Sequence, residues 1–427
     1  MTADLGVPGE PVDPRSAPTG SPLQGSPAAQ AVLAAAFALA REWAGPTLQS
    51  LVLGGSHASG EGVWARVDGA LVTLSDLDLY AVLADAGACR AAQARARAAQ
   101  PQLAQQLLAA GLGAPLEVAF ITRDGLAHLP ARPGALELLR TGRVVLGDVS
   151  VRDAIPRWTA ADIAREEVTL LLENRAFELL LGWPGLGSLA ALERLRGRHA
   201  RLKTMADLAG VFALEAGEWP AGAAARIEWA RAHALAAFAE HAPGALVDVP
   251  ASLDGLWQQS LEWRAHDAQR PVESVPSPAE ARSEWRAAAR AWSAVWWHHQ
   301  GGGQDRYDPW PLATETASRA PLRRRVRRAL EPASRSGVTP PLGGRLRHLF
   351  AGTPQHRVNA SASVLLNAAA LSPAVPPPGA PALPAGALRA LCSLGVTAAP
   401  DWERARQDVV RAWDQWVLDG QRTAERR

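Results

Sequence analysis

The segment Leu51 to Leu83 constrains the fold most strongly, because it joins a short apolar strand, a glycine turn and a second apolar strand that carries two carboxylates. Successive side chains of a strand point to opposite faces, so Asp76 and Asp78 are expected to lie on one side and to converge. Carboxylate oxygens suit a hard cation such as Mg²⁺, which completes its shell with water and substrate phosphates. The pattern therefore predicts a site for a divalent cation.

A phosphate-binding element should lie beside such a cation, and the turn Gly54-Gly55-Ser56 supplies one. Glycine lets the backbone approach a phosphate closely. The exposed amides of the turn and the Ser56 hydroxyl can donate hydrogen bonds to phosphate oxygens. We therefore expect these three residues to bind the phosphates of a nucleotide.

A third acidic residue, Glu117, interrupts the strongly apolar run from Leu116 to Ile121. Burying an unpaired carboxylate is costly, so a Glu in such a strand needs a cation or a strand end that is open to water. Each signal is common by itself, since Gly-Gly-Ser is usually a turn, Asp-x-Asp is often a solvated strand end and a lone Glu is often an edge residue. Their occurrence together and in this order favours a joint metal and nucleotide site.

The order of strand, Gly-Gly-Ser, strand with Asp-x-Asp, helix and strand with a single Glu resembles the DNA polymerase β-like nucleotidyltransferase superfamily over about the first third of the chain. In that family the Gly-Ser turn grips a nucleoside triphosphate, and three carboxylates hold two Mg²⁺ ions. The resemblance implies that Gly54, Gly55 and Ser56 bind the nucleotide. The metal ligands and catalytic residues that it implies are Asp76, Asp78 and Glu117.

The activity implied by the resemblance is Mg²⁺-dependent transfer of a nucleoside monophosphate from a nucleoside triphosphate to a hydroxyl acceptor, with release of pyrophosphate. ATP is the default donor, on prevalence alone, so the transferred group is expected to be AMP. The acceptor is expected to be a small molecule. Glu117 is one candidate for the base that takes its proton, and Glu167 and Glu173 are competing candidates.

One departure from the family pattern is the distance between the glycine turn and the two aspartates, which is several residues longer than usual. An inserted hairpin explains the extra length, because Val63 to Val67 and Ala70 to Leu74 flank Asp68-Gly69. Asp-Gly is favoured in two-residue hairpin turns. We therefore expect a hairpin between the phosphate turn and the metal ligands.

A second departure is Ser59, which stands where many relatives carry Arg, while His57 stands where an aromatic residue is common. The grip on the phosphates is then expected either to be weaker or to be supplied from elsewhere. Lys203 is a candidate, because it is the only lysine of the chain and lies in a helix that loosely resembles a Lys-containing helix of related helical domains. We hypothesise that Lys203 contacts the β- or γ-phosphate, and an ordinary surface lysine is the alternative.

A chain of 427 residues exceeds what one hydrophobic core normally serves. We predict an α+β protein in three parts. Residues 1–27 are a Pro/Gly/Ser-rich disordered tail, and residues 28–154 are the nucleotidyltransferase domain with a small mixed sheet and flanking helices. Residues 155–427 are a large all-α domain with a proline-rich loop near 372–385.

The helices and strands follow from hydrophobic periodicity and from breakers. Proline removes a helix hydrogen bond, so Pro101 is expected to break its helix. In the first domain, the elements expected besides those above are helices at Ala28 to Ala44 and Ala86 to Ala110 and a strand at Arg143 to Leu146. In the second domain, helices are expected at Ala160 to Leu181, Leu189 to Glu215, Ala223 to His241, Ser252 to Ala265, Ala279 to His298 and Trp402 to Thr423.

Charge and cysteine content narrow the functional classes. The net charge of +2 gives no reason to expect a nucleic-acid partner, and the basic run from Arg323 to Arg328 is interpreted as a solvated helix face. Cys89 and Cys392 are too few for a disulfide framework, and the sequence contains no apolar run of membrane-spanning length and no signal-peptide core. We therefore expect a cytoplasmic enzyme without a membrane partner.

The helix at Ala279 to His298 carries a tryptophan stripe formed by Trp285, Trp292 and Trp296. Aromatic residues at helical spacing normally face the interior, so we predict core packing rather than a stacking platform for a sugar or a base. The following pair, His298-His299, is predicted to be a surface helix end, because adjacent helical residues point in different directions and cannot share a metal.

Two other classes of protein remain open. A metal-dependent glycosyltransferase also uses Asp-x-Asp to hold a nucleotide-sugar diphosphate, but this leaves the upstream Gly-Gly-Ser and the later Glu117 unexplained. A non-catalytic protein that binds nucleotide, or that pairs with a toxin as an antitoxin does, is the other class. Such proteins often lose the acidic residues, whereas all three are present here.

Overall fold

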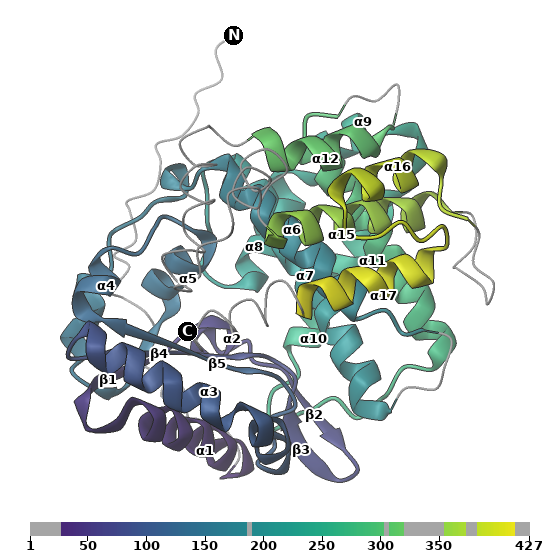
Figure 1. Cartoon of the computed structure of the whole chain (residues 1–427). Coiled ribbons are helices and arrows are strands. Elements are labelled where there is room, and N and C mark those ends of the chain that lie inside the picture. The colour runs from purple at the N-terminus through teal and green to yellow at the C-terminus, as the bar shows by residue number, and fades with distance from the viewer. Residues whose placement is uncertain (1–26, 186–189, 303–306, 320–353, 373–381, 415–427) are drawn as a thin grey trace. The chain divides into compact units, whose positions relative to one another are not determined.

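The computed structural model describes residues 27–185, 190–302, 307–319, 354–372 and 382–414 (Figure 1). The chain divides into two compact units. The described part of the first is residues 27–64, 70–162 and 267–270, and the second comprises residues 65–69 and the described residues of 163–266 and 271–414. Three predicted features lie outside the described residues: residues 1–26 of the expected tail at 1–27, the basic run at 323–328 and the proline-rich segment at 373–381.

A four-stranded mixed sheet forms the first unit, which confirms the predicted α+β class. Its strand order is β5-β4-β1-β6, with β1 antiparallel to both neighbours and β4 parallel to β5. The strands are β1 (Leu48–Leu53), β4 (Leu77–Leu83), β5 (Leu116–Thr122) and β6 (Arg143–Gly147). The helices are α1 (Pro27–Ala44), α2 (Gly55–Ser59), α3 (Ala86–Ala109), α4 (Arg123–Ala127) and α5 (Pro133–Thr141), with short 3₁₀ turns η1 (Gly45–Thr47), η2 (Val149–Ala154) and η3 (Ala160–Asp162).

Alternation along the strands creates two different faces of this sheet. Leu77 and Leu79 of β4 are buried with α1 and α3, whose alanines allow close approach to the sheet. Val82, on the opposite face, is buried with residues of α4, α5 and η2, and Tyr80 packs against the same cluster. Figure 1 shows α1 and α3 side by side on one face of the sheet. The face that carries Asp78 is therefore the one opposite α1 and α3.

The predicted hairpin is confirmed. Strands β2 (Trp64–Val67) and β3 (Ala70–Thr73) form a two-stranded sheet around the predicted turn. Both turn residues have positive φ, 49° at Asp68 and 82° at Gly69. Positive φ at both central residues is what a type I′ turn requires, and Asp and Gly tolerate it well.

The predicted break in the second helix is wrong, because α3 continues through Pro101 as a single helix from Ala86 to Ala109. A proline removes one hydrogen bond from a helix. The surrounding residues of α3 are mostly alanine, glutamine, arginine and leucine, which are strong helix formers. Their summed propensity outweighs the loss at one position.

The second unit is helical, and its helices agree with the predicted ones to within a few residues, except that the predicted helix from Ala223 to His241 is two helices and that three described helices were not predicted. Its described helices are α6 (Arg165–Leu181), α7 (Ala191–Glu215), α8 (Ala223–His233), α9 (Leu235–His241), α10 (Val249–Arg264), α11 (Pro278–His299), α12 (Pro309–Arg319), α15 (Pro354–Leu371), α16 (Ala385–Leu394) and α17 (Trp402–Trp413), with the 3₁₀ turn η4 (Gly244–Leu246). The part of the predicted helix from Trp402 to Thr423 that follows residue 414 lies outside the described residues.

The tryptophan stripe of α11 faces the core, as predicted. Trp285 is 1% exposed, and Trp292 and Trp296 are fully buried. The indole of Trp285 donates a hydrogen bond to the carbonyl of Leu179 (2.7 Å), and that of Trp292 donates to the carbonyl of Leu172 (2.9 Å). The rings of Trp285 and Trp292 therefore fill space and also tie α11 to the backbone of α6.

Helix α15 is the largest element that the sequence did not predict. It contacts α6, α11, α12, α16 and α17. Its buried face includes small polar residues, and these are satisfied within the helix, since Ser361 donates to the carbonyl of Arg357 (2.8 Å) and Ser363 to that of Asn359 (3.2 Å). A buried helix with internally satisfied polar residues shows no apolar stripe in its sequence.

The predicted surface position of His299 is wrong, since the residue is 1% exposed. Its Nδ1 lies 2.7 Å from Oε1 of Glu215, and its Nε2 lies 2.9 Å from Oγ1 of Thr169. The last turn of α11 is packed against α6 and α7, so this histidine links three helices. Its polar contacts explain why it can be buried.

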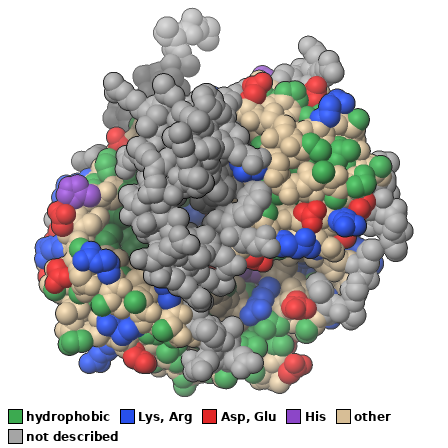
Figure 2. Space-filling model, in the orientation of Figure 1, with side chains coloured by type: hydrophobic (Ala, Val, Ile, Leu, Met, Phe, Trp, Pro, Cys, Tyr) green, Lys and Arg blue, Asp and Glu red, His purple; other side chains and the backbone are tan. Residues whose placement is uncertain are grey.

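The described surface mixes charge of both signs. On the face shown in Figure 2, basic and acidic side chains are interspersed with hydrophobic and neutral ones. This distribution agrees with the small net charge of +2. Within the described ranges, no helix is both long enough and apolar enough to cross a membrane.

Replacing His299 tests its structural role. His299→Ala should lower the free energy of unfolding by about 2–4 kcal/mol, because it opens a cavity and removes the partner of the Glu215 carboxylate. Urea unfolding followed by circular dichroism measures the change. The exposed His233 is the matched control, and His233→Ala should change stability by less than about 0.5 kcal/mol. Equal effects of the two variants would contradict the role assigned to His299.

Candidate functional site

Two of the three predicted carboxylates face each other across β4 and β5. The parallel register pairs Asp78 with Glu117 and Tyr80 with Ala119. Directly paired residues of neighbouring strands lie on the same face of a sheet, so these four side chains share one side. They border a hollow of about 210 Å³, whose lining residues are Asp78, Leu79, Tyr80, Glu117, Val118 and Ala119.

The glycine turn lies against Asp78. The amide of Gly54 donates a hydrogen bond to the carbonyl of Asp78 (2.8 Å), and α2 begins at the next residue. Gly55 has a φ of +61°, a left-handed conformation that favours glycine. A Cβ atom on Gly55 would lie 2.1 Å from Oδ2 of Asp78, so only glycine allows the turn to approach this carboxylate so closely.

Asp76 directly precedes β4, which begins at Leu77, so its convergence with Asp78 stays a prediction. Asp76 is half-buried and is not among the residues that border the hollow. In the part of the chain that the structure describes, no group of three or more His, Cys, Asp or Glu side chains is arranged to hold a metal ion. Asp78 and Glu117 are thus the pair that the fold brings together.

His57 supports the turn from inside the unit. It is 7% exposed, its Nε2 lies 3.0 Å from Oγ1 of Thr73, and its ring meets Trp64 edge-on. Burial lowers the pKa of His57 to about 4, although a hydrogen bond to Ser75 and the charge of Asp76 oppose this shift. A neutral, buried imidazole therefore fastens α2 to β3, which is a structural role.

Ser59 closes α2. Its hydroxyl donates to the carbonyl of Ser56 (3.1 Å) and lies 3.3 Å from Oε2 of Glu61. Gly60 follows in the left-handed conformation that commonly ends a helix. The hydroxyl of Ser59 is therefore engaged in capping the end of α2.

Tyr80 is a part of the site that the sequence analysis did not single out. Burial, followed by the negative charges of Asp78 and Glu117, raises the pKa of the Tyr80 phenol to about 12. The phenol therefore stays protonated at neutral pH. Its position two residues after Asp78 in a strand was the available signal, because residues i and i+2 share a face.

The remaining candidates lie in the second unit. Lys203 is half-buried on α7, and its contact with a phosphate stays a prediction. Glu167 and Glu173 lie on α6, and Glu173 is 4% exposed with its Oε2 3.7 Å from Nδ1 of His356. Burial beside a histidine gives Glu173 a partner within the helical unit.

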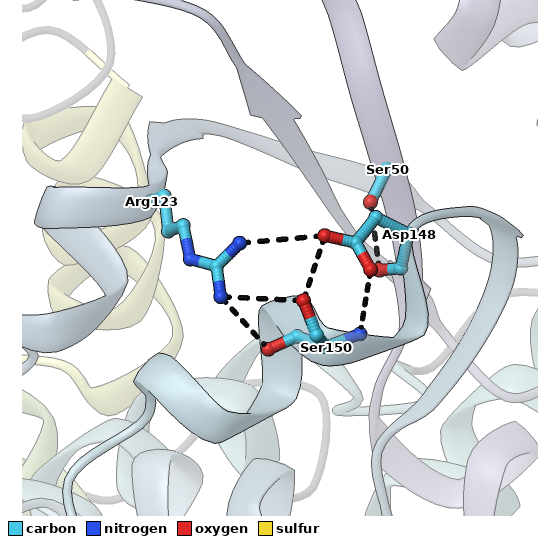
Figure 3. A network of polar contacts seen from close by, with 4 residues as sticks. All are labelled: Ser50, Arg123, Asp148 and Ser150. Atoms are coloured by element: carbon cyan, nitrogen blue, oxygen red, sulfur yellow. Dashed lines mark hydrogen bonds and ion pairs between the residues drawn. The ribbon is translucent and has the colours of Figure 1, made fainter.

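A polar network joins α4 and η2, which pack on the Asp78 face of the sheet, to strand β1 (Figure 3). Asp148 follows β6, and its carboxylate accepts hydrogen bonds from the amide (2.9 Å) and the hydroxyl (2.7 Å) of Ser150. Arg123 of α4 donates to this carboxylate and to the Ser150 carbonyl, both at 3.3 Å. Ser50 of β1 donates to the Asp148 carbonyl (3.0 Å). The network thus joins α4 and η2 to the sheet.

Hydrogen bonds from Ser150, together with the charge of Arg123, lower the pKa of the Asp148 carboxyl group. The carboxylate is exposed to solvent and caps η2, which begins directly after Asp148.

Comparison of the chain with protein-family models, curated protein sequences and solved structures found no significant match. The chemistry of the site is therefore inferred from its own geometry. That geometry combines two carboxylates on neighbouring strands, a glycine turn in contact with one of them, and a protonated phenol on the same face.

The first residue of α2, Gly55, and the glycine that follows its last residue, Gly60, provide a matched test of the close approach. Gly55→Ala and Gly60→Ala both place a side chain at positive φ, which costs about 1–2 kcal/mol. Only Gly55→Ala also drives a methyl group into Asp78, since a Cβ on Gly60 meets nothing within 4 Å. We expect Gly55→Ala to be the more destabilising variant by at least about 1 kcal/mol in urea unfolding. Equal losses would show that the turn does not contact Asp78 in solution.

The buried His57 predicts a pH dependence of stability. The unfolded chain protonates this histidine below about pH 6.5, whereas the folded chain keeps it neutral down to about pH 4. The unfolded state therefore binds more protons in this window, and the free energy of unfolding should fall by up to about 3 kcal/mol as the pH is lowered from 6.5 to 4. Urea unfolding at several pH values measures the slope, and His57→Gln should flatten it. Parallel curves for the two proteins would exclude this role.

Proposed function

We propose that the first unit is a Mg²⁺-dependent nucleotidyltransferase, which moves a nucleoside monophosphate from a nucleoside triphosphate to a hydroxyl acceptor and releases pyrophosphate. The observation that carries the proposal is the contact between the Gly55 turn and the Asp78 carboxylate, with Glu117 paired to Asp78 on the next strand. A phosphate-binding turn and metal-binding carboxylates are useful together only when the ligand brings both a phosphate and a cation. ATP is the default donor and a small molecule the expected acceptor.

The residues present suit Mg²⁺. This ion usually takes one or two protein carboxylates and completes its octahedral shell with water and substrate phosphates. Asp78 and Glu117 supply such a pair, and Asp76, next to the start of β4, is the third ligand of the proposed two-ion site. When bound, Mg²⁺ would neutralise phosphate charge and stabilise the departing pyrophosphate.

The protein's own groups have separate roles in the proposed reaction. The backbone amides at the start of α2 and the Ser56 hydroxyl hold and orient the phosphates of the donor. The acceptor oxygen forms a bond to the α-phosphorus, and the bond from that phosphorus to pyrophosphate breaks. Glu117, whose side chain is exposed at the hollow, takes the proton of the acceptor hydroxyl.

The glycosyltransferase alternative is less well supported. An Asp-x-Asp motif that binds a nucleotide sugar requires neither a glycine at Gly55 nor a carboxylate opposite Asp78. A non-catalytic nucleotide-binding or antitoxin-like protein would not need Glu117 to face the hollow. Both thiols, Cys89 and Cys392, are free, which suits the reducing cytoplasm that we propose as the location.

Charge-removing variants test the catalytic proposal. Asp78→Asn and Glu117→Gln keep the shape of each side chain but remove the charge that a cation requires, so each should reduce transfer at least about 100-fold. The measurement incubates the protein with α-labelled ATP, Mg²⁺ and cell extract and then locates the label. Thermal melts should show that both variants remain folded. Asp124→Asn, at an exposed carboxylate of α4, is the matched control and should retain activity.

Ligand-dependent melting separates the alternatives. Adding Mg²⁺ and ATP together should raise the melting temperature of the protein, because a ligand stabilises only the state that binds it. A UDP-sugar with Mn²⁺ should not. The reverse pattern would favour the glycosyltransferase, and near wild-type transfer by Asp78→Asn would refute the metal site.

A further inference from the structure

Tyr80 occupies the position beneath the glycine turn. It lies two residues after Asp78 on the same face of β4, and the register places the small Ala119 beside it on β5. Both residues border the hollow. Four side chains face the hollow from these two strands, namely those of Asp78, Tyr80, Glu117 and Ala119. The aromatic ring of Tyr80 is the largest of them.

The ring lies next to the space that a side chain on Gly54 would occupy. A Cβ atom built on Gly54 would lie 3.3 Å from Cε2 of Tyr80 and 3.6 Å from Cδ1 of Leu138. Tyr80 also packs against the buried cluster that contains Val82 and Leu138. One end of this side chain is thus anchored in the core, and an edge of its ring lies beside Gly54.

We propose that Tyr80 is a positioning residue for the Gly54-Gly55-Ser56 turn. Its ring holds the turn in the position at which the backbone amides of the turn and the Asp78 carboxylate can bind the same nucleotide. The inference rests on the proposed function. The turn is fixed at one point by the hydrogen bond from Gly54 to the Asp78 carbonyl, and the ring supplies a second point of support. With both supports in place, the turn cannot tilt about the hydrogen bond of Gly54. Such precision matters because binding groups must be held within a fraction of an ångström.

The ring carries this role, and the phenol hydroxyl does not. The atom of Tyr80 that lies nearest to a Cβ built on Gly54 is a ring carbon, Cε2. Phenylalanine keeps that ring, whereas leucine keeps apolar character but is shorter and lacks the flat edge. Comparing the two replacements therefore separates support of the turn from any effect of the hydroxyl.

The test measures the affinity for the Mg²⁺ complex of α,β-methylene-ATP, a non-hydrolysable analogue, by titration calorimetry. Tyr80→Phe should bind within about twofold of the wild type, and Tyr80→Leu should bind at least about tenfold more weakly. Val82→Ala is the matched control, because Val82 is buried in the same cluster and does not border the hollow. It should lower the melting temperature and leave the affinity unchanged.

Failure of the inference and failure of the proposed function give different results. If the wild type does not bind the analogue, the proposed function falls and the inference falls with it. If the wild type binds and Tyr80→Leu binds equally well, or loses no more affinity than Val82→Ala, only the role of Tyr80 is overturned.

A second variant keeps the test decisive if Tyr80→Leu fails to fold. Gly54→Ala adds a methyl group 3.3 Å from the ring and should push the turn away from its support, which weakens binding about as strongly as Tyr80→Leu. Gly54→Ala in the Tyr80→Phe background should show the same loss, since the ring is still present. Unchanged affinity in Gly54→Ala would overturn the inference.

Discussion

The parallel pairing of β4 with β5 is the constraint on which the rest of the site depends. It places Asp78 opposite Glu117, and a shift of one residue would turn Glu117 toward the face covered by α1 and α3. Burial of Leu77 and Leu79 against those helices makes such a shift costly, because it would also expose the apolar side chains of one strand. The hydrophobic core thus determines the register, and the register determines the spacing of the carboxylates.

Local chemistry made part of this arrangement predictable from sequence. The hairpin followed from Asp68-Gly69, whose positive φ values few other dipeptides tolerate. Glu117 stood out because a single carboxylate in an apolar strand requires a special environment. The tryptophans of α11 were assigned to the core from their spacing alone, and the elements around the glycine turn were located to within a few residues.

Other features depend on contacts that a local pattern does not reveal. The burial of His299 is possible only because Glu215 and Thr169 arrive from two other helices. The role proposed for Tyr80 depends on the approach of its ring to Gly54, which lies on a different element. Asp76 was predicted to lie within the strand, and β4 begins one residue later, at Leu77. For His299 and Tyr80, tertiary context adds what the local signal does not contain.

The crossover through α3 has a consequence for the order in which the site is assembled. The glycine turn and Asp78 belong to neighbouring antiparallel strands, whereas Glu117 joins them only after the chain has passed through the whole of α3. Closing the longer loop carries a larger entropic cost, and parallel pairing is intrinsically slow. The half that carries the glycine turn is therefore expected to form before the second carboxylate docks. Under the proposed function, a partly folded chain could then hold a nucleotide before it is competent to use one.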